Sequence, residues 1–264
     1  MEFEPTFSPE NKKERNEKEI IKELRKEGER SEELKALIEE KWKDHKEDLK
    51  NEEELIKEMN EREFTDKEIE EELEEEKTET YERYMEDFDL TEEDLEGKSI
   101  LDLGCGEMAP FIQKLMEKDL EVELKGVDID LDEDHLPEEL EGVVEYANFE
   151  KEIPEGSYDY VLAYGSIFAY EGRNPERAIL NAVEKLNAGG EMKIMPISEP
   201  IEGDIKPMEK QWNKMKSILE KAAEENNLTL EIKGVDFMIS GNDEKNKDVW
   251  IRNLATLKKI NKDK

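Results

Sequence analysis

Cysteine, histidine and long apolar runs are all scarce in this chain of 264 residues. Cys105 is the only cysteine, so no internal disulfide bond can form. The two histidines, His45 and His135, lie in charged segments, and no Cys/His spacing is typical of zinc, so we expect no metal site. No apolar run approaches the ~18 residues of a membrane span, and the N-terminus lacks a signal-peptide core. These absences predict a cytoplasmic protein without membrane contact.

Positive charge is also in short supply, with 40 Lys and Arg against 75 Asp and Glu and a formal net charge of −35. Such a surface repels phosphates, so we expect neither nucleic acid nor anionic lipid as a partner. Only 35% of the residues are hydrophobic and 44% are charged, too polar a mixture for one uniformly packed globule. Apolar residues cluster after about residue 98, which predicts a packed domain there. We divide the chain into an acidic helical extension over 1–80 and a domain over 81–264.

The extension has thin apolar stripes at helical spacing, and one helix is predicted over 66–88. Capping boxes, in which an Asn or Thr precedes an acidic residue by three positions, are predicted at Asn51–Glu54, Thr65–Glu68 and Thr91–Asp94. The last stripe before the domain is the richest in aromatics and consists of Tyr81, Tyr84, Met85 and Phe88. It predicts a helix that lies across the carboxyl ends of the following strands as a lid, or alternatively one that packs on outer helices.

Strand and helix patterns alternate from Gly97 onward. Strands are predicted over 99–104, 121–130, 143–149, 158–165, 191–198, 228–239 and 249–260, and helices over 110–119, 174–187 and 210–227. The turn Ala188-Gly189-Gly190 is expected to end the second of these helices. This alternation favours an α/β fold, Rossmann-like and doubly wound, with a mostly parallel seven-stranded sheet and the acidic extension attached to its N-terminus.

A glycine-rich turn follows the first predicted strand, in the segment "SILDLGCGEMAPF". Its stretch GCGEMA, residues 104–109, formally matches the dinucleotide fingerprint G-x-G-x-x-G/A. However, Asp102 before the turn and Glu107 within it would repel a pyrophosphate and attract an ammonium group. Asp128, at the end of the second strand, is placed to accept hydrogen bonds from ribose hydroxyls. The residues therefore predict a ligand with a ribose and a cationic part.

These motifs resemble the class I S-adenosylmethionine-dependent methyltransferases over about residues 81–264. The similar segments are, in order, "KSILDLGCGEMAPF", "KGVDID", "ANFEKEIPEGSYDYVLAYGSIF" and "NPERAILNAVEKLNAGGEMKI". Met108 departs from the family pattern, in which many members have a third glycine. The resemblance implies a methyltransferase with S-adenosylmethionine as cofactor and a small molecule or a protein as methyl acceptor.

The resemblance also implies a set of cofactor-binding residues. These are Asp102 for the methionine amino group, Gly104 and Gly106 for close backbone approach, Asp128 for the ribose, Ile129, Asn148 and Phe149 for adenine, and Tyr164 near the sulfonium. Tyr164, Tyr170 and Glu171 are the polar groups placed to touch an acceptor, and they are weak candidates for catalysis. No Asn/Asp-Pro-Pro-aromatic element follows the fourth strand, which argues against the methylases of exocyclic nucleic-acid amines.

The residues alone leave other roles open. Asp102 could cap the turn, Asp128 could be an ordinary strand-end acid, and the adenine-flanking pair could be shifted by one position. Cys105 has no histidine close in sequence, so we interpret it as a packing residue rather than a nucleophile. Two other functions stay open as well, a catalytically silent methyltransferase-like scaffold and an NAD-dependent oxidoreductase.

Overall fold

The computed structural model describes residues 39–47, 65–131, 136–168, 174–202, 205–240 and 248–261. The chain divides into two compact units. One consists of Met1–Glu63, Ser198–Trp212 and Lys233–Asn253, and the other of Phe64–Ile197, Asn213–Ile232 and Leu254–Lys264. In the first unit, the helix over 39–47 carries the buried Trp42, and the guanidinium of Arg252 donates to Asp236 at 2.8 Å. The second unit contains the glycine-rich turn over residues 104–109.

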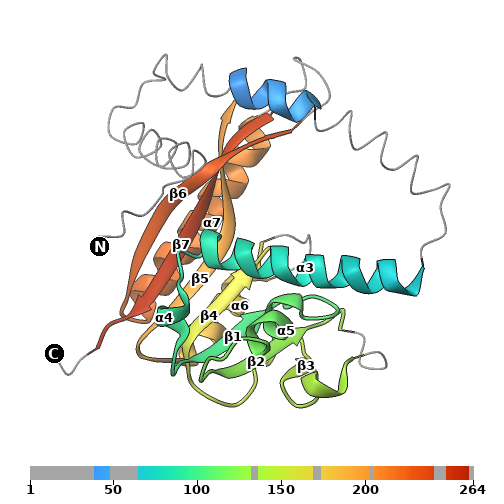
Figure 1. Ribbon diagram of the computed structural model, residues 1–264. Helices are drawn as coiled ribbons and strands as arrows, with labels where there is room; N and C mark the ends of the chain where they lie inside the picture. The colour runs from blue at the N-terminus through green and yellow to red at the C-terminus, as the bar shows by residue number, and fades with distance from the viewer. Residues whose placement is uncertain are drawn as a thin grey trace, which may run out of the picture. The chain divides into compact units, whose positions relative to one another are not determined.

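A seven-stranded sheet in the order β3-β2-β1-β4-β5-β7-β6 forms the framework (Figure 1). Its strands are β1 (Ser99–Leu103), β2 (Glu123–Asp128), β3 (Val144–Tyr146), β4 (Tyr158–Tyr164), β5 (Leu186–Glu202), β6 (Leu228–Ser240) and β7 (Asp248–Lys259). The pairs β3-β2, β2-β1, β1-β4 and β4-β5 are all parallel. The order reverses direction between β1 and β4, so a switch point lies at the carboxyl ends of these two strands.

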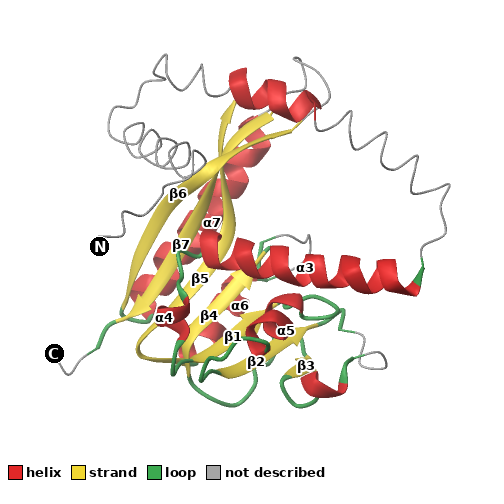
Figure 2. Cartoon of the chain, viewed as in Figure 1, coloured by secondary structure: helices red, strands yellow, loops and turns green. Residues whose placement is uncertain are grey.

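The helices are α3 (Asp66–Asp87), α4 (Glu92–Leu95), α5 (Pro110–Met116), α6 (Pro175–Glu184) and α7 (Ile205–Glu225), with a 3₁₀ turn over Glu138–Leu140. Helices α5 and α6 cover opposite faces of the sheet (Figure 2). Every residue of β1 is buried, as expected for a parallel strand covered on both faces. The predicted α/β class, Rossmann-like and doubly wound, is therefore confirmed.

Local sequence signals predicted the starts of two helices correctly. The capping boxes Thr65–Glu68 and Thr91–Asp94 are both present, and they begin α3 and α4. The box predicted at Asn51–Glu54 lies outside the described residues. Helix α3 continues without a break through residues 80 and 81, and the domain boundary placed there stays a prediction.

The predicted helix over 174–187 is too long, because α6 ends at Glu184 and β5 already begins at Leu186. The pair Gly189-Gly190 lies inside β5 and does not end the helix, and the reason is physical. A Cβ at Gly190 would lie 2.9 Å from the carbonyl oxygen of Tyr158, so this glycine allows close approach of β4 rather than stopping a helix. The register between β4 and β5 shifts at this point, which makes the segment a bulge in the strand.

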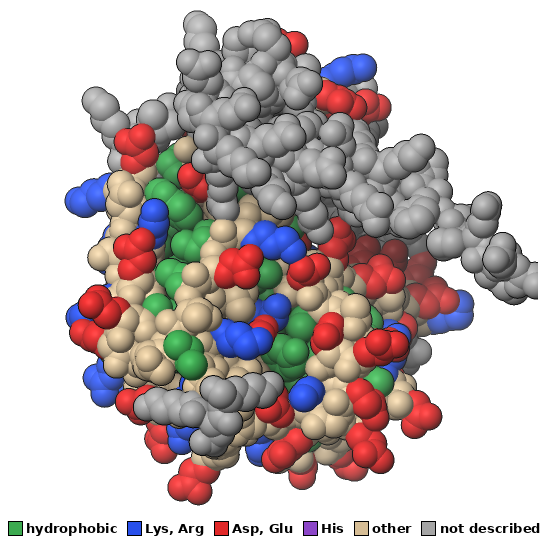
Figure 3. All heavy atoms as spheres, turned by 90° about the vertical axis from the view of Figure 1, so that its left-hand side faces the viewer, with side chains coloured by type: hydrophobic (Ala, Val, Ile, Leu, Met, Phe, Trp, Pro, Cys, Tyr) green, Lys and Arg blue, Asp and Glu red, His purple; other side chains and the backbone are tan. Residues whose placement is uncertain are grey.

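The surface carries both signs of charge, and Figure 3 shows basic side chains interspersed among the more numerous acidic ones on one face. Ion pairs join α3 to α5, where Lys77 and Lys114 each contact both Glu74 and Glu117. Within the described ranges, no helix is both long and apolar enough to cross a membrane.

Candidate functional site

The glycine-rich turn leaves β1 along a path that only small residues allow. Gly104 and Gly106 both have positive φ, +80° and +82°. A Cβ at Gly104 would lie 2.3 Å from the Cβ of Ser166, so Ser166 from the turn after β4 packs directly on this backbone. The Ser166 hydroxyl donates to the carbonyl of Leu103, which fixes the two turns together at the switch point.

Asp128 closes the other side of the turn. Its Oδ2 accepts a hydrogen bond from the amide of Gly106 at 2.8 Å, and its Oδ1 accepts one from the amide of Asp130 at 2.8 Å. The carboxylate is therefore held by backbone donors of both loops, β1–α5 and the one after β2. Because each carboxylate oxygen can accept more than one hydrogen bond, Asp128 keeps capacity for ligand hydroxyl groups.

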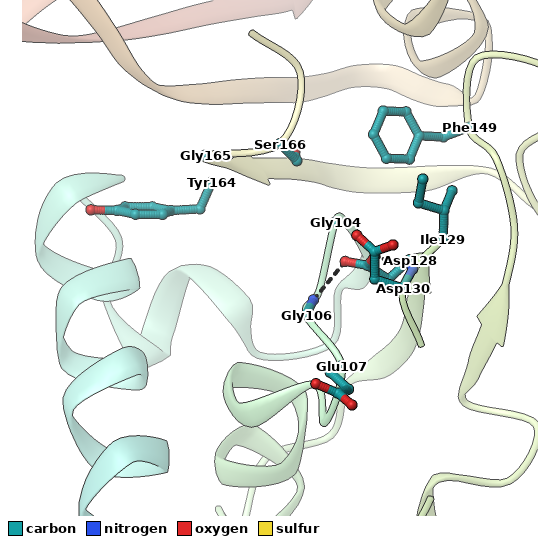
Figure 4. A pocket seen from close by; sticks show the side chains of 10 residues that line it. All are labelled: Gly104, Gly106, Glu107, Asp128, Ile129, Asp130, Phe149, Tyr164, Gly165 and Ser166. Carbon is teal, nitrogen blue, oxygen red and sulfur yellow. Dashed lines mark hydrogen bonds between the residues drawn. The ribbon is translucent and has the colours of Figure 1, made fainter. Parts of the chain in front are cut away.

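A pocket of about 220 Å³ opens above these turns, many times the volume of one water molecule. It is lined by Gly104, Gly106, Glu107, Asp128, Ile129, Asp130, Phe149, Tyr164, Gly165 and Ser166. Figure 4 shows Ile129 and Phe149 at one end and Tyr164 at the other, with its hydroxyl turned toward a helix. The pocket thus has an apolar end, an acidic middle and an aromatic end.

Most of the predicted cofactor residues line this pocket, namely Gly104, Gly106, Asp128, Ile129, Phe149 and Tyr164. Asn148 does not, and instead its side-chain oxygen accepts from the amide of Glu150 at 3.0 Å and shapes the loop. Tyr170 and Glu171 lie outside the described residues, as does His135. Sequence reasoning missed Asp130, Gly165 and Ser166, although their position just after β2 and β4 is the signal that marks ligand sites in such sheets.

Asp102 lies beneath the pocket rather than in its lining. It is 0% exposed, and its register partners on the neighbouring strands are Gly126 and Leu162. Its Oδ1 accepts a hydrogen bond from the hydroxyl of Tyr84 at 3.4 Å, and its Oδ2 has no hydrogen-bond partner among the described residues. Burial, together with the negative charge of Asp128, raises the pKa of Asp102 to about 8.

The last turns of α3 bring an aromatic cluster to the same place. The ring of Tyr84 stacks on Phe111 at 4.3 Å and on Tyr164 at 5.1 Å between ring centroids. The Tyr164 hydroxyl donates to the buried Asp87 at 2.7 Å. Thus α3 contacts Tyr164, which lines the pocket, through Tyr84 and Asp87, and it packs on α5 through Phe111. No described residue of α3 lines the pocket itself, so the role of α3 as a lid stays a prediction.

Cys105 is 4% exposed, and burial raises the pKa of its thiol. A buried thiol of raised pKa does not provide a thiolate, which supports its interpretation as a packing residue. No cluster of three metal-ligating side chains is found in the parts of the chain that the structure describes. His45 lies on the helix over 39–47, where its ring is 5.5 Å from that of Trp42.

No family model and no curated protein matches this sequence. Solved structures do match in fold. Phosphoethanolamine N-methyltransferase 2 of Haemonchus contortus, in complex with S-adenosylmethionine, is 15% identical with a TM-score of 0.44, over 69% of this chain and 52% of that one. A methyltransferase of Thermotoga maritima is 16% identical with a TM-score of 0.38, over 71% of this chain and 99% of that one. The cyclase SpnF is 15% identical with a TM-score of 0.43, over 69% of this chain and 80% of that one.

This chain therefore spans about half the length of the Haemonchus protein. Folds of this type host unrelated reactions, so the fold alone assigns no activity to this chain. The class defined by the sheet order and the pocket is a Rossmann-like α/β protein with a pocket at its switch point.

Proposed function

We propose that this protein binds S-adenosylmethionine in the pocket above the glycine-rich turn and transfers its methyl group to an acceptor. The observation that carries the proposal is the hydrogen bond from the amide of Gly106 to Asp128. In a dinucleotide site, amides of this turn point at the pyrophosphate. Here the amide of Gly106 already donates to a carboxylate of the protein itself, so it is not available to a pyrophosphate.

The charges of the pocket support the same ligand. Its lining contains the acidic residues Glu107, Asp128 and Asp130, and no basic side chain is found among the described lining residues. A pyrophosphate carries two negative charges that this lining would disfavour. S-adenosylmethionine carries a sulfonium and an ammonium group beside a single carboxylate, so its cationic parts suit an acidic pocket.

The residues present fit the parts of such a cofactor. Asp128 would accept hydrogen bonds from the ribose hydroxyls, and Ile129 and Phe149 would enclose the adenine at the apolar end. When bound, S-adenosylmethionine supplies a methyl group on a good leaving group. The protein then needs chiefly to hold an acceptor in line with that group and to exclude water. Tyr164, supported by the stacked ring of Tyr84 from α3, would contribute to both.

The acceptor belongs to the proposal as a small molecule or a protein. Nucleic acid is disfavoured by the net charge of −35. The proposed location of the protein is the cytoplasm. A catalytically silent scaffold would bind the cofactor without turnover, and an NAD-dependent oxidoreductase would bind the dinucleotide, so ligand binding and turnover separate these functions.

Titration calorimetry with S-adenosylmethionine, its product S-adenosylhomocysteine and NAD tests the proposal. We expect both sulfur ligands to bind and NAD not to bind. Asp128→Ala should weaken binding, whereas Asp119→Ala, at an exposed aspartate away from the pocket, should leave it unchanged. Tight NAD binding would refute the proposal. Incubation of cell extract with methyl-labelled cofactor, with and without the protein, then reveals the acceptor, and binding without any transfer would favour the scaffold.

A further inference from the structure

Tyr84 on α3 contacts the candidate site through its ring and through one polar atom, its hydroxyl oxygen. Its side chain is 5% exposed and its ring is enclosed by Phe111, Tyr164 and Phe88, the last in an edge-on contact at 5.3 Å. Aromatic contacts on three sides fix the direction of the ring and hence of its hydroxyl. That hydroxyl donates to Oδ1 of Asp102, the only hydrogen-bond partner of this carboxyl group among the described residues.

The second oxygen of Asp102 lacks what a buried carboxylate requires. Buried charges in proteins are paired or fully hydrogen-bonded, and Oδ2 has neither a donor nor a cation among the residues that the structure describes. The groups that face Asp102 are the Tyr84 hydroxyl from α3, the carboxylate of Asp128 from β2 and the thiol of Cys105 after β1. The register partners on β2 and β4, Gly126 and Leu162, carry no titratable group. Once ionised, Asp102 would require a positive charge, which none of these facing groups supplies.

We propose that Tyr84 is a positioning residue of the cofactor site, which holds Oδ1 of Asp102 so that Oδ2 receives the ammonium group of the methionine moiety. This inference rests on the proposed function. In the ligand-free protein, burial favours the neutral carboxylic acid form of Asp102. When the ammonium group arrives, the carboxyl O–H bond breaks, the proton passes to solvent, and the carboxylate pairs with the ammonium on one side and the Tyr84 hydroxyl on the other.

Both the position and the pKa of Asp102 support the loss of its proton when an ammonium group binds. Gly104, two residues after Asp102 in the chain, lines the pocket, so Asp102 lies next to the turn that the cofactor would cover. A pKa of about 8 makes Asp102 mostly protonated at pH 7 in the absence of a cation, and pairing with an ammonium group lowers the pKa of a carboxyl. Binding of an ammonium-bearing ligand should therefore expel close to one proton at neutral pH.

Two ligands separate this role from a merely structural one. S-adenosylhomocysteine carries the ammonium group, whereas 5′-methylthioadenosine keeps the adenine, ribose and sulfur but has no amino acid part. Calorimetry at pH 7 in phosphate and in Tris, buffers of different ionisation enthalpy, counts the protons released. For the wild-type protein we expect release of most of one proton with S-adenosylhomocysteine, from the pKa of about 8, and none with methylthioadenosine.

Tyr84→Phe keeps the stacked ring and removes only the hydroxyl. We expect Tyr84→Phe to lower the affinity for S-adenosylhomocysteine by about tenfold and to leave the affinity for methylthioadenosine unchanged. The reason is that the lost hydrogen bond is charge-assisted only when Asp102 is ionised. Tyr81→Phe is the matched control, because Tyr81 lies on the same helix and stacks on the same Phe111, but its hydroxyl donates to Glu92 at 2.9 Å. Tyr81→Phe should change neither the affinity for S-adenosylhomocysteine nor that for methylthioadenosine.

The possible outcomes are distinguishable. If the wild-type protein binds neither S-adenosylhomocysteine nor methylthioadenosine, the proposed function fails. If it binds S-adenosylhomocysteine without releasing a proton, or if Tyr84→Phe weakens both ligands equally or neither, the function stands and the inference about Tyr84 is overturned.

Discussion

Asp102→Asn should alter the pH dependence of stability in a way that depends on the buried carboxyl group alone. In the folded protein the pKa of Asp102 is raised from 3.8 to about 8. Between these values the folded state keeps the proton and the unfolded state has lost it, so the folded state binds about one more proton. The free energy of unfolding then falls as pH rises, by about 1.4 kcal/mol per pH unit. Asparagine does not titrate and removes this dependence.

The quantity to measure is the difference in unfolding free energy between Asp102→Asn and wild type. It should grow by about 2–3 kcal/mol from pH 5 to pH 7 and level off above about pH 8. Any constant penalty of the buried amide shifts all points equally, and the other titrating groups cancel in the difference. Urea unfolding followed by circular dichroism at four pH values provides the data, with the exposed Asp119→Asn as a flat reference. A flat difference for Asp102→Asn would refute the reasoning.

Further outcomes follow from the pocket, the charge and α3. Asp128→Ala should weaken S-adenosylhomocysteine binding by roughly 1–3 kcal/mol in calorimetry, because charge-assisted hydrogen bonds to the ribose are lost; unchanged affinity would contradict the ribose role. The melting temperature should rise from low to moderate salt, since counterions screen the self-repulsion of a net charge of −35, and a flat or falling value would indicate local charge balance. Deletion of residues 1–60 should leave a folded, cofactor-binding protein. Deletion of residues 1–90 removes Tyr84 and Asp87 and should impair cofactor binding or folding. Equal cofactor affinity of the two deletion variants would reject the prediction that α3 is a lid.

The parts of the site that follow strands were predictable from the sequence. A parallel sheet gathers the residues after its strands at one edge, so Gly104, Gly106 and Asp128 needed only correct strand assignments to be brought together. The same rule would have added Asp130 and Ser166. Helix starts were predictable for a similar reason, because a capping box such as Thr65–Glu68 involves only residues within one turn.

Features set by contacts between distant segments were not predictable in this way. Sequence pattern extends α6 to Asn187, yet the side-chain amide of Asn187 donates to Asp159 at 3.1 Å and the neighbouring Leu186 is buried opposite Tyr158. Tertiary pairing with β4 therefore overrides the helical preference of this stretch. The misread boundary lies where strand contacts, rather than local propensity, set the conformation.

The aromatic stripe before β1 shows how one pattern can serve two roles. Helical spacing predicted that Tyr81, Tyr84 and Phe88 share a face, but spacing alone does not say what each hydroxyl meets. In the structure Tyr81 donates to Glu92 on the surface, while Tyr84, one turn later, donates to the buried Asp102. The difference arises because α3 approaches the sheet only in its last turns, where the buried Lys193 also donates to the carbonyl of Phe88 at 3.0 Å. A helix that meets the sheet at its end places a single tyrosine hydroxyl beside the buried carboxyl of Asp102. This position makes Tyr84 a candidate positioning residue of the cofactor site and Tyr81 its control.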